Sequence, residues 1–166
     1  MTSNDISVPI APMKTRIAVT TVVFSFFAAT ASFAANPHIG TWKLNEAKSK
    51  LAPGTGKNTT VTYTEQKEMI KVTVEGVDKD GKPTHAVWIG KFDGKTYPAK
   101  GNLPWNAAAY KVVNDRTNDI TAMKDGKMVW SGRIEVAPDG KSRTVTVHGT
   151  DASGKKFKSV AVYNRA

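Results

Sequence analysis

The chain has 166 residues, with 24 Lys and Arg against 14 Asp and Glu, so its formal charge is +10, and it contains no Cys. A hydrophobic fraction of 40% with 23% charged residues is typical of a globular protein and argues against a disordered tail protein. The length fits one domain, and the absence of Cys excludes disulfides, thiolate nucleophiles and zinc sites with Cys ligands.

The first 34 residues have the pattern of a secretory signal peptide. Lys14 and Arg16 precede an uncharged run over residues 17–31, which is followed by Ser32-Phe33-Ala34. The run is about 15 residues long, shorter than the roughly 20 that cross a bilayer as a helix. We therefore predict cleavage after Ala34, with the first Met or Met13 as the true start. The alternative interpretation is a buried N-terminal helix.

Export would leave a mature domain of residues 35–166. Cleavage removes Lys14, Arg16 and Asp5, so the formal charge falls from +10 to +9. Because there is no Cys to carry a lipid, we expect no stable membrane insertion after cleavage. These features predict a soluble protein of the periplasm or the extracellular space.

The tripeptide Asp-Gly-Lys recurs along the mature domain, at residues 80–82, 93–95, 125–127 and 139–141. Asp-Gly is a strong β-hairpin signal. The runs between these turns are rich in Val, Thr, Ile and aromatic residues that alternate with period two, which indicates strands. The predicted strands are residues 40–45, 59–66, 69–77, 84–92, 107–114, 119–124, 128–137, 143–150 and 156–164.

The alternation gives the clearest strands one apolar face, whereas residues 84–92 and 156–164 are apolar on both faces, which suggests a second cover from the N-terminal segment or a loop. Ile70, Val72 and Val74 alternate with polar residues, and so do Val145 and Val147. One face of such a sheet meets a core and the other meets water. Consecutive antiparallel hairpins of this kind form a sandwich or an up-and-down barrel. An outer-membrane barrel is a further alternative, which the charged hairpins at both ends disfavour.

The two ends of the mature domain resemble a known family. Gly40-Thr41-Trp42 opens the first predicted strand and is similar to the Gly-x-Trp signature of lipocalins. Lipocalin-like folds commonly place an Arg or Lys late in the last strand, over that Trp, and Arg165 has this position. Residues 72–78 and 115–117 also look like small secreted bacterial proteins of the lipocalin-like (calycin-like) type.

This resemblance covers essentially the whole mature domain. It implies an all-β fold, an antiparallel up-and-down β-barrel of about eight or nine strands. Gly40, Trp42 and Arg165 would be its structural signature.

Candidate catalytic residues are few. His38, His85 and His148 are isolated from one another in the sequence, whereas a metal site needs several converging ligands. The acidic residues occur singly in turns, where they usually accept backbone hydrogen bonds. We therefore expect no catalytic residues, no metal and no cofactor, and we do not predict an enzyme.

The positive charge bears on the kind of partner. Lys and Arg lie mainly in hairpin tips and at outward strand positions, the usual distribution on exposed edges, and an exported protein rarely meets nucleic acid. We therefore predict no nucleic-acid partner, and a weak, salt-sensitive attraction to an anionic envelope surface.

Aromatic residues are the candidate ligand-binding side chains, namely Tyr63, Trp88, Trp105, Tyr110 and Trp130. Four of them have the inward parity of their strands, and Trp105 lies in the longest break of the strand pattern, residues 97–106. A barrel of this size is either just filled by side chains or holds one small ligand, and both remain open. We predict a protein that binds or carries a small apolar ligand, which enters beside residues 97–106. The alternative is a cavity-poor envelope module that binds an anionic surface or a protein partner.

Overall fold

Ten β-strands dominate the part of the chain that the structure describes. The structure is a computed structural model, and it describes residues 36–151 and 153–166. The predicted signal peptide lies outside the described residues. Within these residues, no helix is long and apolar enough to cross a membrane. The strands are β1 (Gly40–Leu44), β2 (Lys57–Gln66), β3 (Met69–Val77), β4 (Pro83–Gly90), β5 (Asp93–Gly101), β6 (Ala107–Asn114), β7 (Thr117–Lys124), β8 (Lys127–Val136), β9 (Ser142–Thr150) and β10 (Lys156–Arg165), and the 3-10 turn η1 (Glu46–Lys48) follows β1.

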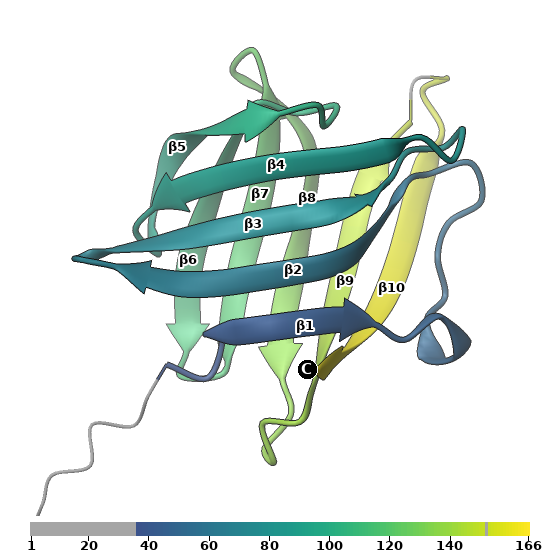
Figure 1. Cartoon of the computed structure of the whole chain (residues 1–166). Helices are drawn as coiled ribbons and strands as arrows, with labels where there is room; N and C mark the ends of the chain where they lie inside the picture. The colour runs from purple at the N-terminus through teal and green to yellow at the C-terminus, as the bar shows by residue number, and fades with distance from the viewer. Residues whose placement is uncertain (1–35, 152) are drawn as a thin grey trace, which may run out of the picture. The chain divides into compact units, whose positions relative to one another are not determined.

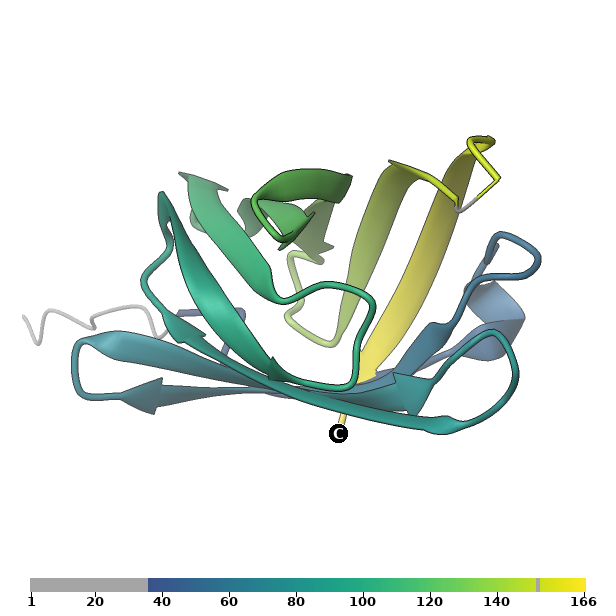
Figure 2. The same cartoon turned by 90° about the horizontal axis from the view of Figure 1, so that it is seen from above.

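The strands close into a barrel. Each strand pairs antiparallel with the next along the chain, and β1 pairs with β10 (Figure 1). Figure 2 shows the same strands curving round from β1 to β10. Closure pairs the two strands that would otherwise be sheet edges. The predicted all-β, antiparallel up-and-down barrel is therefore confirmed, with ten strands where the sequence analysis expects eight or nine.

β5 is the strand that the sequence analysis misses. The sequence pattern predicts a hairpin turn at residues 93–95 and the longest loop at residues 97–106, and both predictions are wrong because Asp93–Gly101 is a strand. Only Tyr97 and Ala99 of β5 are partly buried, and Pro98 has no N–H for the ladder, so the apolar alternation of a typical strand is missing. The loop that remains is residues 102–106.

The up-and-down path places alternate connections at opposite ends of the barrel. One end, named here the η1 end, has η1 and the connections β3–β4, β5–β6, β7–β8 and β9–β10. The other end, named the N-terminal end, has residues 36–39 and the connections β2–β3, β4–β5, β6–β7 and β8–β9. Between β7 and β8, Asp125 and Gly126 have φ of 50° and 80°, as a two-residue type I′ hairpin requires.

Apolar side chains at alternate strand positions fill the barrel. In β3, Val72 and Val74 are buried and Ile70 is half-buried, whereas Glu75 is exposed, as the alternation predicts. The apolar face of the sheet is therefore its inner face. The buried residues of the core cluster are Trp42, Val61, Tyr63, Val72, Val74, Trp88, Trp105, Ala108, Tyr110, Ile120, Ala122, Ile134, Val136, Ala161 and Tyr163.

The segment around η1 continues the pairing of β1 along the edge of β10. Lys50 and Val160 exchange two backbone hydrogen bonds, of 2.7 and 2.9 Å. The N–H of Asn45 donates to the carbonyl of Val162 at 2.8 Å. Val160 and Val162 alternate with the buried inner residues of β10 and are themselves half-buried. The outward side of β10 is therefore partly shielded from solvent, in a strand that is apolar on both faces.

Candidate functional site

Arg165 connects the two ends of the described chain. Its guanidinium carbon is 4.2 Å from the centroid of the Trp42 ring. Its Nε donates to the carbonyl of Gly140 at 2.7 Å, Nη1 to that of Ile39 at 2.6 Å and Nη2 to that of Pro37 at 2.7 Å. The predicted packing of Arg165 over Trp42 is confirmed, and the same side chain ties the residues before β1 to the barrel.

His38 packs against the N-terminal end of the barrel interior. It is buried, and its ring meets Phe92 edge-on with the centroids 6.3 Å apart. Its carbonyl accepts a hydrogen bond of 2.9 Å from Nε1 of Trp42. Burial, reinforced by the charges of Arg143 and Arg165, lowers the pKa of His38 to about 4. The imidazole is therefore neutral at neutral pH.

The structure separates the five predicted ligand-binding residues into two groups. Tyr63, Trp88 and Tyr110 belong to one aromatic cluster inside the barrel. Trp105 and Trp130 pack edge to face against each other, with ring centroids 6.1 Å apart. Trp105 lies in the β5–β6 connection, so the second group is at the η1 end.

The first group is packed against itself and against Phe92. The ring centroid of Tyr110 is 4.6 Å from that of Trp88, 5.0 Å from that of Phe92 and 6.3 Å from that of Tyr63. Nε1 of Trp88 donates to the carbonyl of Ala108 at 3.0 Å. Each aromatic pair of this kind contributes about 0.5–1.5 kcal/mol beyond its area burial. In this structure the three residues act as core.

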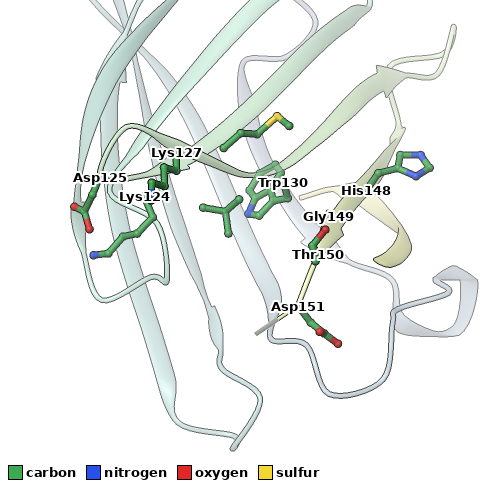
Figure 3. Close-up of a pocket in the computed structure, with 10 residues that line it drawn as sticks. Lys124, Asp125, Lys127, Trp130, His148, Gly149, Thr150 and Asp151 are labelled. Carbon is green, nitrogen blue, oxygen red and sulfur yellow. The ribbon is translucent and has the colours of Figure 1, made fainter. Parts of the chain in front are cut away.

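A pocket of about 480 Å³ opens at the η1 end, between the β7–β8 hairpin and the last residues of β9 (Figure 3). Met128, Val129 and Trp130 supply its apolar lining, and Lys124 and Lys127 are among its charged residues. Figure 3 shows Trp130 between the β7–β8 turn and residues 149–151. Small-molecule sites commonly have volumes of about 300–1,000 Å³. This pocket is therefore large enough for a small ligand.

The acidic residues of the pocket are engaged in turns. Oδ1 of Asp151 accepts from the N–H groups of Ser153 and Lys155, both at 2.9 Å, and Oδ1 of Asp125 accepts from Nδ2 of Asn106 at 2.8 Å. The Ser153 hydroxyl and these backbone donors lower the pKa of Asp151. Across residues 36–151 and 153–166, no three His, Asp or Glu side chains converge to form a metal site. The pocket thus offers apolar contact beside a rim that carries two Lys and two Asp side chains.

Arg143 is a charged residue inside the barrel that the sequence analysis does not identify. It lies on β9 and is only 2% exposed. Its guanidinium carbon is 4.9, 4.8 and 5.0 Å from the ring centroids of Trp42, Tyr63 and Tyr163. Its Nε and Nη1 are buried and have no hydrogen-bond partner in the described part of the chain.

The tyrosines near Arg143 do not neutralise its charge. Burial raises the pKa of Tyr163 to about 12, although the charge of Arg143 opposes this shift. Burial also raises the pKa of Tyr110 well above its usual value. Both phenols are therefore neutral at neutral pH. The ion pairs found between described residues all join other side chains.

The alternation of β9 is the signal that could have identified Arg143. Val145 and Val147 are predicted to lie on the inner face, and Arg143 has the same parity. Because Arg is almost never fully buried unless it is paired, its position at the start of a strand suggests an exposed side chain. The strand parity of Arg143 predicts a buried side chain and its residue type predicts an exposed one, and the structure agrees with the parity.

No protein-family model matches the chain, and no curated protein matches it. Two solved structures are similar to it in fold. One is described as the structure of EF1p2_mFAP2b bound to DFHBI, with 15% identity, a TM-score of 0.44, and coverage of 80% of this chain and 97% of that chain. The other is described as a redesigned beta barrel, mFAP1, bound to DFHBI, with 18% identity, a TM-score of 0.41, and coverage of 80% and 98%.

Proposed function

We propose that this barrel is an exported, lipocalin-like protein that binds a small, largely apolar molecule at its η1 end, over Trp130. The observation that carries the proposal is the pocket of about 480 Å³ with Trp130, Val129 and Met128 in its lining. Trp130 is half-buried and braced from inside by Trp105, so it presents a ring that is already held in place. A preorganised aromatic surface loses little side-chain freedom on binding.

The chemistry of the pocket supports binding without catalysis. Its carboxylates hold turns, and its one imidazole, that of His148, lies on an exposed residue of β9. Affinity would come from burial of apolar surface, at about 25 cal/mol per Å², so covering ~200 Å² of ligand would contribute ~5 kcal/mol before the cost of association. We expect broad selectivity and modest affinity.

Calorimetric titration with a neutral naphthalene derivative tests this site. Trp130→Ala should weaken binding at least tenfold, whereas Trp130→Phe should stay within about threefold of the original protein, because a ring is retained. Val112→Ala is the matched control, because Val112 is an exposed apolar residue of β6 outside the pocket. Equal affinity in Trp130→Ala and the original protein would contradict the proposal.

The second candidate function is attachment to an anionic envelope surface. The observation that favours it is Met128, an apolar side chain that is 67% exposed and lies beside Lys127 in the β7–β8 hairpin. Co-sedimentation with phosphatidylglycerol vesicles should then decrease with added salt and in a Lys124→Gln/Lys127→Gln variant. A Lys95→Gln/Lys141→Gln variant, with changes at the N-terminal end, is the control. Equal binding by both variants would exclude the hairpin as the contact.

A further inference from the structure

We infer that the interior of the barrel holds a small monovalent anion, or a carboxylate group, against Arg143. This site is separate from the proposed pocket over Trp130, because Arg143 begins β9 beside the N-terminal end of the barrel. Four observations support the inference: the burial of Arg143, its unpartnered donors, the absence of a buried acid, and the other donors inside the barrel.

Burial makes the charge of Arg143 costly to leave uncompensated. A guanidinium is a positively charged group with donors only, and a buried charge is normally paired and hydrogen-bonded. The faces of Trp42, Tyr63 and Tyr163 attract the cation, with ring centroids within 5.0 Å of its central carbon. Ring faces are weak acceptors of N–H hydrogen bonds, so Nε and Nη1 still need a partner.

The described chain supplies no negative charge at this depth. No Asp or Glu is buried among residues 36–151 and 153–166. Tyr163 is neutral because burial raises its pKa to about 12, and its hydroxyl already donates to the carbonyl of Asn58 at 3.1 Å. The described residues therefore offer Nε and Nη1 of Arg143 no anionic partner.

The other unpartnered groups of the interior are also mostly donors. Nδ2 of Asn118 is buried without a partner, and so are both ring nitrogens of His38. A neutral imidazole has one N–H donor, and Asn Nδ2 is a donor only. Among the residues that the structure describes, the interior is rich in donors, carries one fixed positive charge and holds no buried carboxylate, which fits an anion and disfavours a cation.

The negative charge that binds Arg143 has two possible sources, a free small anion or the acidic head of an apolar molecule. For the first source, thermal unfolding is followed against chloride, nitrate and acetate at constant ionic strength, with gluconate as the balancing salt. We expect a saturable rise of Tm for at least one of these anions. Arg143→Met should abolish the saturable rise, and Arg116→Met, which removes an exposed Arg from the β6–β7 connection, should retain it.

For the second source, decanoate is compared with decanol in calorimetry. If the group is an acidic head, decanoate should bind at least tenfold more tightly than decanol, and Arg143→Met should remove the difference. A free anion instead gives the saturable Tm rise with no preference for decanoate. Binding of both decyl compounds with equal affinity, together with no saturable Tm rise, overturns the anion site and leaves the pocket over Trp130 intact.

Two further measurements keep the inference testable if Arg143→Met does not fold. Arg143→Lys retains the charge but loses the planar set of donors, so the anion should bind at least tenfold more weakly. In crystals soaked in bromide, an anomalous peak should lie within hydrogen-bond distance of Nε or Nη1 of Arg143. A water molecule at that position, with bromide found only at surface lysines, would overturn the inference.

Discussion

The guanidinium of Arg165 lies over the ring of Trp42, with 4.2 Å between the guanidinium carbon and the ring centroid. Its Nε, Nη1 and Nη2 atoms donate to carbonyls of the β8–β9 connection and of the residues before β1. One side chain therefore joins the first strand, the last strand and the start of the described chain.

Arg165→Ala should lower the free energy of unfolding by about 2 kcal/mol or more. A cation over an aromatic ring contributes roughly 0.5–2 kcal/mol, and hydrogen bonds from a charged donor add to this. Arg165→Lys should have a free energy of unfolding between those of the original protein and Arg165→Ala, because an ammonium keeps the charge but cannot reach three carbonyls at once. Urea unfolding measures both variants. A loss below about 0.5 kcal/mol for Arg165→Ala would refute this role.

Gly40→Ala should destabilise the barrel by about 2 kcal/mol or more. Gly40 has a φ of +124°, and a Cβ there would lie 2.6 Å from Nη1 of Arg165. Gly126→Ala is the matched control, since Gly126 also has positive φ (+80°) but has open space around its Cβ position. Its cost should be about 1 kcal/mol, from backbone strain alone. Equal losses in the two variants would mean that the contact with Arg165 is unimportant.

The stability of the barrel should fall with pH between about 6.5 and 4. The pKa of His38 is lowered to about 4 in the folded protein, so in this window the unfolded chain binds a proton that the folded chain does not. Folding is therefore favoured above pH 6.5 and loses up to about 3 kcal/mol as the pH reaches 4.

Urea unfolding at several pH values measures this slope. His38→Gln should flatten it, whereas His148→Gln, at an exposed position, should leave it unchanged. A slope of the same size in His38→Gln and the original protein would assign the effect to other groups.

Trp88 and Trp130 should respond differently to removal. Trp88 is fully buried within the aromatic cluster, so Trp88→Ala should cost about 3–5 kcal/mol of stability. Trp130 is half-buried at the pocket, so Trp130→Ala should cost less, about 1–2 kcal/mol, while it removes ligand binding. Chemical unfolding of both variants gives the comparison. A greater loss for Trp130→Ala would make Trp130 a core residue and weaken the proposed function.

The sequence predicts the face on which a strand residue lies better than its height along the barrel axis. Period-two alternation correctly places Tyr63, Tyr110 and Trp130 on the inner face. Height depends on the register and stagger of ten paired strands, which alternation does not contain. For this reason the predicted set of ligand-binding residues mixes a packed cluster with the lining of a pocket.

The sequence-based prediction differs from the structure at two other places, β5 and Arg143, and each difference has a specific physical cause. β5 lacks an apolar face because most of its residues are exposed, so neither alternation nor composition distinguishes it from a loop. Arg143 has inward parity, but its charge argues for solvent, and only the packed structure shows the ring faces of Trp42 and Tyr163 around it.

The most direct test of the proposed function is a two-dimensional NMR titration of the isotope-labelled protein with a neutral naphthalene derivative. Saturable shifts should appear at residues 124–130 and 148–151, and at the indole N–H of Trp130, all with one dissociation constant. The indole N–H of Trp42, at the opposite end of the barrel, should stay unchanged. The absence of saturable shifts around Trp130, or shifts confined to the cluster of Tyr63, Trp88 and Tyr110, would contradict ligand binding at the η1 end.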